Sequence, residues 1–281
     1  MLIYRFENRN EYEVHLVNQN ETLRDRYLDI IKLEEENANQ SFTFEAFSIT
    51  AGKNVKLGVD WAHSNGKHIN WRERLICPIT NLNNRQRACY HLFLSELHPY
   101  ADDKVYITEQ VSPFYGFLKD RVKWLKGSEY VDSDLPSGHI TEADLRHEDF
   151  TNLSFEDNSL DKIMSFDCLE HIPNYKAAIA ESYRVLKENG RALFSFPFSK
   201  GLDETLVRAT MSEDGVISHL TEPEYHGDPL SNEGCLSYYT FGWDVLDTFR
   251  NIGFNNVYAL VYWSDIFGYL GDEKIVFVAQ K

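Results

Sequence analysis

Apolar and polar positions follow their clearest pattern over residues 153–198. Residues 160–166 are mostly apolar and predict a short buried strand. Apolar residues then recur at helical spacing over 177–186, and residues 191–196 predict a second buried strand. Two buried strands joined by one helical crossover are typical of a parallel βαβ unit.

The first 80 residues show a weaker pattern. Residues 1–20 alternate between apolar and polar positions, which predicts a small hairpin. Residues 21–37 predict an amphipathic helix, and residues 41–76 are rich in β formers. We therefore predict an N-terminal α+β appendage over residues 1–80, which could cap a substrate, mediate dimerisation or be purely structural.

The remaining residues, 81–281, alternate predicted helices and strands, as α/β domains do. Helices are predicted over 81–98 and 242–253, and further strands over 104–108, 128–134, 256–263 and 274–279. Residues 199–241 lack such a pattern, and a segment of this length inside a compact domain is usually a lid or a binding loop. We predict that this segment forms the substrate loop of the domain.

Composition and charge argue against several kinds of binding partner and cellular location. The chain of 281 residues has a formal net charge of −16, which argues against nucleic acid and against an anionic membrane surface. No stretch reaches the ~18 apolar residues that a membrane span needs. The N-terminus has no secretory-signal pattern and the four cysteines are scattered, so we expect a reduced, cytoplasmic protein. Cys77-Pro78 has no second cysteine at zinc-knuckle spacing, so no zinc site is predicted there.

Three motifs carry a resemblance to a known family. They are LSFEDNSLD at 153–161, LEHIP at 169–173 and RVLKENG at 184–190. Together they resemble the class I S-adenosylmethionine (SAM)-dependent methyltransferases, in particular the small-molecule group with the signature LPF-DNSFD…LEHIP…RVLKPGG. The resemblance implies a Rossmann-like sheet, mostly parallel with an antiparallel last strand. It also implies SAM as cofactor and S-adenosylhomocysteine as product.

The family's glycine-rich loop after the first strand is absent. Residues 108–113 contain no glycine, and the next one is Gly116. We expect a rebuilt loop, in which Glu109 and backbone amides hold the methionine end of the cofactor.

The resemblance implies further cofactor residues. An acid at the end of the strand 128–134 would accept the ribose hydroxyls, which assigns Asp134, with Asp132 as the rival. Asp149 would accept the adenine amine, and Phe150 would offer its amide and an apolar face to the ring. Asp167 ends the next strand, near the point of methyl transfer. The acids could instead be turn and capping residues.

Candidate acceptor residues follow the strands. His171 and His226 are candidate bases, because a histidine that titrates near neutral pH can deprotonate a hydroxyl, although each could equally be structural. A metal site from His219, His226 and Asp228 has no fixed ligand spacing, so no metal is predicted. The remaining residues predicted to bind the substrate are Tyr225, Asp228, Arg208 and Tyr238.

These patterns predict a SAM-dependent methyltransferase that acts on a small-molecule or glycan-type acceptor, at oxygen because the loop offers histidines. A homodimer through residues 1–80 is compatible with this prediction. The missing glycine loop leaves a catalytically silent binding or assembly protein of the same fold as the alternative. A nicotinamide-dependent oxidoreductase would need Gly-x-Gly-x-x-Gly after the first strand, and the chain lacks it.

Overall fold

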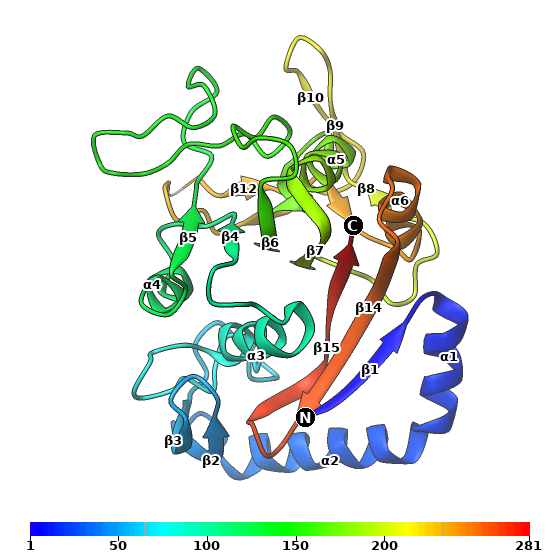
Figure 1. Ribbon diagram of the computed structural model, residues 1–281. Helices are drawn as coiled ribbons and strands as arrows, with labels where there is room; N and C mark the ends of the chain where they lie inside the picture. The colour runs from blue at the N-terminus through cyan, green and yellow to red at the C-terminus, as the bar shows by residue number, and fades with distance from the viewer. Residues whose placement is uncertain (65, 232) are drawn as a thin grey trace. The chain divides into compact units, whose positions relative to one another are not determined.

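The computed structural model describes residues 1–64, 66–231 and 233–281 (Figure 1). The chain forms two compact units, each built from several stretches of sequence. The first unit holds Met1–Phe6, Asn10–His98 and Leu260–Ile275, and the second holds Glu7–Arg9, Pro99–Ala259 and Val276–Lys281. None of the described helices is long and apolar enough to cross a membrane.

Helices and one hairpin dominate the N-terminal part of the chain. Its elements are β1 (Leu2–Phe6), α1 (Arg9–Asn18), α2 (Asn20–Glu36), β2 (Phe42–Ser48), β3 (Lys53–Val59), α3 (Asn84–Leu92) and the π-helix η1 (Phe93–Leu97). The helix α2 confirms the predicted amphipathic helix, and β2 pairs with β3 antiparallel. The helix α3 begins at a capping box, in which Asn83 and Gln86 satisfy each other's backbone N–H groups.

The hairpin predicted over residues 1–20 is wrong. Only β1 is extended, and the helix α1 follows it. Tyr12 and His15 are the buried residues of α1, and they stand three positions apart. That spacing places both side chains on one helical face, and it outweighs the weak alternation that suggested a second strand.

A buried arginine holds the core of the first unit together. Leu57, Trp71 and Leu270 are among its buried residues. The fully buried guanidinium of Arg87 donates to the carbonyl oxygens of Leu75 (3.2 Å), Phe267 (2.8 Å) and Gly268 (2.8 Å). The unit therefore includes α3 and a C-terminal stretch, and the division of the chain differs from the predicted boundary at residue 80.

A mostly parallel sheet forms the frame of the second unit. Its principal elements are β4 (Lys104–Ile107), α4 (Pro113–Lys119), β5 (Trp124–Gly127), β6 (Leu160–Phe166), the 3-10 helix η2 (Leu169–His171), α5 (Tyr175–Val185), β7 (Leu186–Ser195), α6 (Asp244–Ile252), β14 (Asn256–Ser264) and β15 (Tyr269–Gln280). The strands β14 and β15 run on into the first unit.

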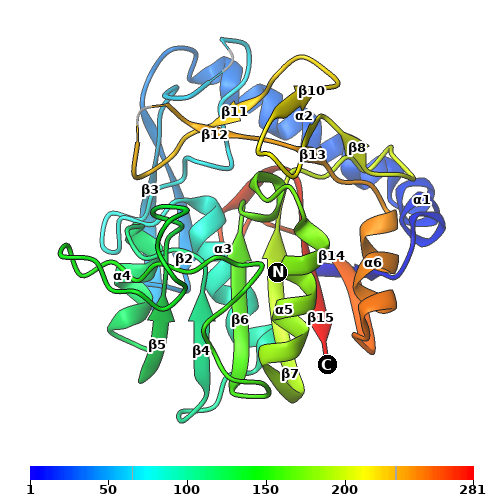
Figure 2. The same ribbon diagram turned by 90° about the horizontal axis from the view of Figure 1, so that it is seen from above.

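The order of these strands defines the fold. They follow one another as β14-β15-β7-β6-β4-β5. Figure 2 shows β5, β4, β6 and β7 side by side, and each neighbouring pair among them is parallel. The strand β15 pairs with β7 antiparallel. This is the Rossmann-like sheet of class I methyltransferases, so the predicted fold class and the predicted βαβ unit are confirmed.

The strand predicted over 128–134 is wrong. The strand is β5, and it ends at Gly127. A Cβ added to Gly127 would lie 2.5 Å from the backbone oxygen of Glu109 and 2.5 Å from the ring of Tyr115. The chain therefore leaves the sheet where it approaches the loop after β4, and only a glycine fits this approach.

The segment 199–241 folds into short antiparallel strand pairs. They are β8 (Leu206–Val207) with β13 (Tyr239–Thr240), β9 (Ala209–Met211) with β10 (Ile217–His219), and β11 (Tyr225–His226) with β12 (Cys235–Leu236). The sequence showed no strand pattern here because each of these strands has only two or three residues.

Candidate active site

The parallel strands bring their carboxyl ends to one edge of the sheet, where open α/β sheets bind ligands. The hydroxyl of Thr108, after β4, donates to Ser165 of β6 at 3.0 Å. Glu109 follows β4, Glu129 follows β5 and Asp167 follows β6. The three acids therefore come from neighbouring strands at the edge where the sequence predicted the cofactor.

The glycine-free loop after β4 is held by a carboxylate from the next strand. Oε1 of Glu129 accepts the backbone N–H groups of Gln110 (2.6 Å) and Val111 (2.9 Å). The side chain of Gln110 in turn accepts from the N–H of Arg146 (2.7 Å) and donates to the carbonyl of Asp144 (2.7 Å). Burial raises the pKa of Glu129, and the two amide donors only partly oppose this shift.

Glu129 is the first acid after β5, and the sequence analysis did not select it. Asp134 and Asp132 lie beyond the end of β5 in an exposed turn, where the N–H of Asp134 donates to Oδ1 of Asp132 (2.9 Å). The assignment of the ribose to Asp134 rested on a strand that ended there, and that premise is wrong. Gly127 was the available signal, because Glu129 is the first acid after it.

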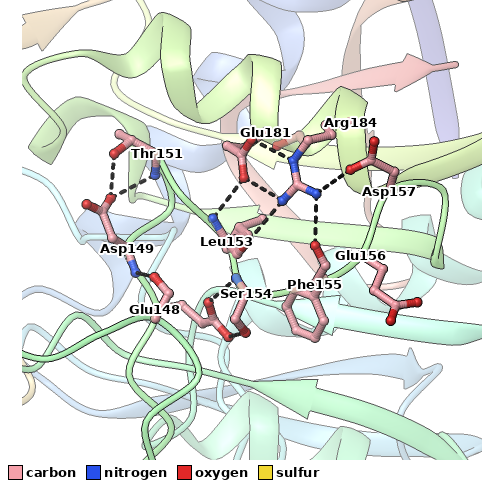
Figure 3. Close-up of polar contacts among 12 residues, drawn as sticks. Glu148, Asp149, Thr151, Leu153, Ser154, Phe155, Glu156, Asp157, Glu181 and Arg184 are labelled. Carbon is pink, nitrogen blue, oxygen red and sulfur yellow. Dashed lines mark hydrogen bonds and ion pairs between the residues drawn. The ribbon is translucent and has the colours of Figure 1, made fainter.

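The predicted adenine residues lie in the loop before β6. Oδ1 of Asp149 accepts from the N–H (2.8 Å) and the hydroxyl (2.7 Å) of Thr151 (Figure 3). Phe150 is buried, with its ring 6.3 Å from the ring of Tyr106 in an edge-on contact. Asp149 therefore uses its Oδ1 within its own turn, and the Phe150 ring packs in the core.

An arginine from α5 fixes the adjoining stretch, as Figure 3 shows. Arg184 donates to the carbonyl oxygens of Leu153 (2.9 Å) and Phe155 (2.9 Å) and to the carboxylate of Asp157 (2.7 Å). It also pairs with Glu181, which accepts the N–H of Leu153 at 2.8 Å. Two of the motifs that carry the family resemblance thus bind each other, which gives them a structural role.

A buried carboxylate between two histidines forms the chemical centre of the site. Oε1 of Glu170, in η2, lies 3.6 Å from Nε2 of His171 and 3.5 Å from Nδ1 of His226. The Glu170 side chain is 0% exposed, and neither of its oxygens accepts a hydrogen bond from the described residues. The rings of the two histidines are 5.0 Å apart. The structure thus brings both predicted bases together, around a carboxylate that the sequence analysis did not select.

The remaining ring nitrogens of the two histidines are held by neighbours. Nδ1 of His171 lies 2.8 Å from the carbonyl oxygen of Leu236, so it carries a proton. Nε2 of His226 lies 3.1 Å from Oε1 of Glu224, which also pairs with Arg208 at 3.0 Å. Arg208 and Glu224 therefore position the His226 ring from its Nε2 side, opposite the nitrogen that faces Glu170.

The electrostatics of the centre favour added positive charge. Burial raises the pKa of Glu170, and the nearby carboxylate of Asp167 raises it further, against the opposing effects of the two histidines. The carboxylate of Glu170 beside its ring and, after it, that of Glu224 raise the pKa of His226 to about 9, against the opposing effect of burial. The cluster therefore attracts a proton or another cation.

The other residues predicted to bind the substrate lie in different surroundings. The backbone N–H of Tyr238 donates to the carbonyl of Glu170 (2.7 Å), and the Tyr238 side chain is buried. Tyr225 is exposed. The two oxygens of Asp228 accept from Leu230 (2.8 Å) and Ser231 (2.8 Å) in a local turn.

Asp167 is held at the end of β6 in a left-handed conformation with φ of 50°. Its N–H donates to the carbonyl of Ser195 (2.8 Å), and its carboxylate accepts the hydroxyl of the same residue (3.1 Å). These bonds join the ends of β6 and β7 directly before the histidine cluster.

Comparison with known proteins finds a methyltransferase likeness over part of the chain. A family described as "Methyltransferase domain" matches residues 123–194, which include β5, β6 and α5. The chain is 40% identical over 50 residues to phosphoethanolamine N-methyltransferase 2 of Caenorhabditis elegans. That match covers 18% of the chain and only 11% of the length of this relative.

Solved structures with similarity include two bacterial proteins. The YcgJ protein of Bacillus subtilis is 21% identical, with a TM-score of 0.32, over 39% of this chain and 50% of that one. An S-adenosylmethionine dependent methyltransferase of Mesorhizobium loti is 10% identical, with a TM-score of 0.40, over 67% of this chain and 97% of that one.

The matched domain implies S-adenosylmethionine as the cofactor, and the strand ends fit this molecule. Gly127 lets the end of β5 pack directly against the backbone of Glu109, and an acid stands after each of β4 and β5. An acid after the second strand can accept ribose hydroxyls, and an acid after the first can pair with an amine. The donor set is thus suited to the cofactor without the usual glycines.

Proposed function

We propose that this protein is a SAM-dependent methyltransferase that transfers a methyl group to an oxygen of a small-molecule or glycan-type acceptor. The observation that carries this proposal is the buried Glu170 carboxylate between His171 and His226, at the edge of the sheet where ligands bind. An oxygen nucleophile has to lose a proton, and this cluster offers groups for that task.

The acids at the strand ends would hold the cofactor. We assign the ribose to Glu129, the methionine end to Glu109 and the adenine side to Asp149 and Phe150, with Asp167 next to the reaction point. Bound SAM supplies an electrophilic methyl group on its sulfonium. The chain itself has to position the acceptor and exclude water.

The segment 199–241 supports an acceptor site beside this edge. His226 lies between Glu170 and Glu224, and Nε2 of His171 faces the same carboxylate. Tyr225, Tyr238, Arg208 and Asp228 belong to the same segment, and we assign the acceptor to this wall. The net charge of −16 favours a neutral or cationic acceptor over a strongly anionic one.

Calorimetric titration with S-adenosylhomocysteine tests the cofactor assignment. We expect binding to the wild type and a loss of at least about 10-fold in Glu129→Gln, since one charge-assisted hydrogen bond contributes about 1.5–3 kcal/mol. Asp134→Ala is the matched control, because Asp134 is exposed and should leave the affinity unchanged. Lost binding in Asp134→Ala together with full binding in Glu129→Gln would reverse the ribose assignment.

The missing glycine loop supports a second candidate, a silent protein of this fold that serves as a binding or assembly partner. Absence of any heat or thermal shift with S-adenosylhomocysteine, in a folded wild type, would favour it. If the cofactor binds, transfer from labelled SAM to panels of hydroxyl and amine acceptors tests the oxygen assignment. The partial likeness to a phosphoethanolamine N-methyltransferase makes ethanolamine-type amines the relevant competing panel.

A further inference from the structure

The cluster of Glu170, His171 and His226 has the composition of a metal centre. One ligand atom from each residue lies within 4.8 Å of the others. Two imidazoles and one carboxylate are a ligand set for divalent transition metals, and His₂Glu sets occur at catalytic zinc sites that keep an open position. This trio differs from the set of His219, His226 and Asp228 that the sequence suggested, and His219 is exposed on β10.

Each histidine turns one ring nitrogen toward the same carboxylate oxygen. Nδ1 of His171 contacts the Leu236 carbonyl, which leaves Nε2 to face Glu170. Nε2 of His226 contacts Glu224, which leaves Nδ1 to face the same oxygen of Glu170. A metal ion could take the place of a proton between these atoms and bind one nitrogen from each ring.

The distances between Glu170 and the two histidine nitrogens suit a shared metal ion better than they suit direct hydrogen bonds. The contacts to Glu170 are 3.5 and 3.6 Å long, beyond the ~2.7–3.2 Å of an N–H···O bond. Ligand atoms held about 2.0–2.2 Å from one tetrahedral zinc ion lie roughly 3.4 Å from each other. The Glu170 oxygens are also buried and accept no hydrogen bond from the described residues, so a ligand would satisfy them.

Groups outside the trio orient it as metal sites require. Ligating histidines usually donate their other ring N–H to a carbonyl or a carboxylate, which fixes the tautomer. The Leu236 carbonyl does this for His171, and Glu224, itself held by Arg208, does it for His226.

We propose that Glu170, His171 and His226 bind a divalent cation of the zinc class, with an open position for an oxygen of the acceptor. The role in transfer rests on the proposed function. An acceptor hydroxyl bound there would release its proton to water, as cation binding acidifies hydroxyls. The O–CH₃ bond would then form as the S–CH₃ bond breaks, and its electron pair stays on sulfur. Both histidines would then act as ligands instead of bases.

Metal titration of the chelator-treated protein tests this proposal. We expect one Zn²⁺ per chain, displaced Zn²⁺ in competition with a chromophoric chelator, and a visible spectrum of tetrahedral type with Co²⁺. His226→Ala and Glu170→Gln should weaken binding by at least about 100-fold, and Glu224→Gln by about 10-fold. His219→Ala is the matched control and should bind like the wild type.

Several outcomes would overturn the site. They are unchanged binding in His226→Ala, a preference for Mg²⁺ over Zn²⁺, or loss of binding in Cys235→Ser, which would move the ion to the thiols. The His226 side chain is 28% exposed, so His226→Ala should fold even if Glu170→Gln does not. The proposal can then be tested with His226→Ala alone. Titration with S-adenosylhomocysteine separates the two proposals. Cofactor binding without Zn²⁺ binding rejects the cation alone, and Zn²⁺ binding without cofactor binding rejects the proposed function.

Discussion

Gly127 lies directly against the backbone of Glu109, so that a Cβ on Gly127 would stand 2.5 Å from the Glu109 carbonyl oxygen. The close approach that the loop after β4 needs is thus provided by a glycine on the neighbouring strand. We expect Gly127→Ala to lower the stability of the second unit by about 1–3 kcal/mol, as overpacking does. The same change should weaken binding of S-adenosylhomocysteine.

Gly116→Ala is the control for this experiment. Gly116 lies in α4, and nothing stands within 4 Å of its added Cβ. Alanine should therefore stabilise the helix by roughly 0.5–1 kcal/mol. Urea unfolding of both variants measures the difference, and equal stability of the two would remove the role assigned to Gly127.

Arg184 should be a structural residue of the site. Arg184→Met removes hydrogen bonds to two carbonyls and two carboxylates, so we expect a loss of about 2–3 kcal/mol and a weaker cofactor site. Asp157→Asn is the matched variant, because Asp157 is 70% exposed and surface pairs contribute about 0–1 kcal/mol. If chemical unfolding gives both variants the same stability, the carbonyl contacts do not fix this loop.

Arg87 should be equally important in the first unit. Arg87→Met leaves two buried carbonyls and one partly buried carbonyl without their donor, and we expect a loss of about 3 kcal/mol. Arg85→Met keeps these contacts and should cost less than about 1 kcal/mol. Hydrogen exchange of amides in β2 and β3 reports on the effect, and unchanged protection in Arg87→Met would contradict it.

Asp161 should make the stability of the fold depend on pH in the acid range. Burial opposes its ionisation, but the hydrogen bonds from Lys187 and the N–H of Lys104 outweigh burial and lower the pKa of Asp161 below 3.8. A lowered folded pKa stabilises the fold above the unfolded pKa, and this stability disappears as the pH falls through the folded value. Asp161→Asn should therefore be less stable than the wild type at pH 7, by about 1 kcal/mol.

The difference between Asp161→Asn and the wild type should shrink once the pH falls below ~4. Thermal melts over this range measure it. Asp102→Asn is the control, because Asp102 pairs with Lys123 and both side chains are exposed. Its stability should differ little from that of the wild type at any pH. A difference for Asp161→Asn that grows with falling pH would have the wrong sign for this account.

The sequence predicted elements well where local periodicity and burial agree. The strand 160–166 matches β6 in full, because its apolar run is bounded by turn residues and buried between parallel neighbours. The prediction was wrong at β5, because a strand of four residues is too short to show an alternating pattern. The position of that strand is set by the contact between Gly127 and Glu109, which is not local in sequence.

Prediction of the site had the same limits. His171 and His226 were selected because a histidine is the usual general base. Glu170, which both histidines contact, was not selected, because nothing in the LEH motif marks it as buried. Its chemistry comes from complete burial and from Leu236 and Glu224, which the chain brings together only on folding. The turn that Asp228 forms with Leu230 and Ser231 was equally invisible in the sequence, because turn contacts are resolved only in the folded chain.

The discontinuous make-up of the first unit sets the order in which the chain can fold. Residues 10–98 are made before Phe267, Gly268 and Leu270, which complete the surroundings of Arg87 and Trp71. Domains generally fold as units while the chain emerges, N-terminal parts first. This unit departs from that order, because its core can close only after more than 150 further residues have been added.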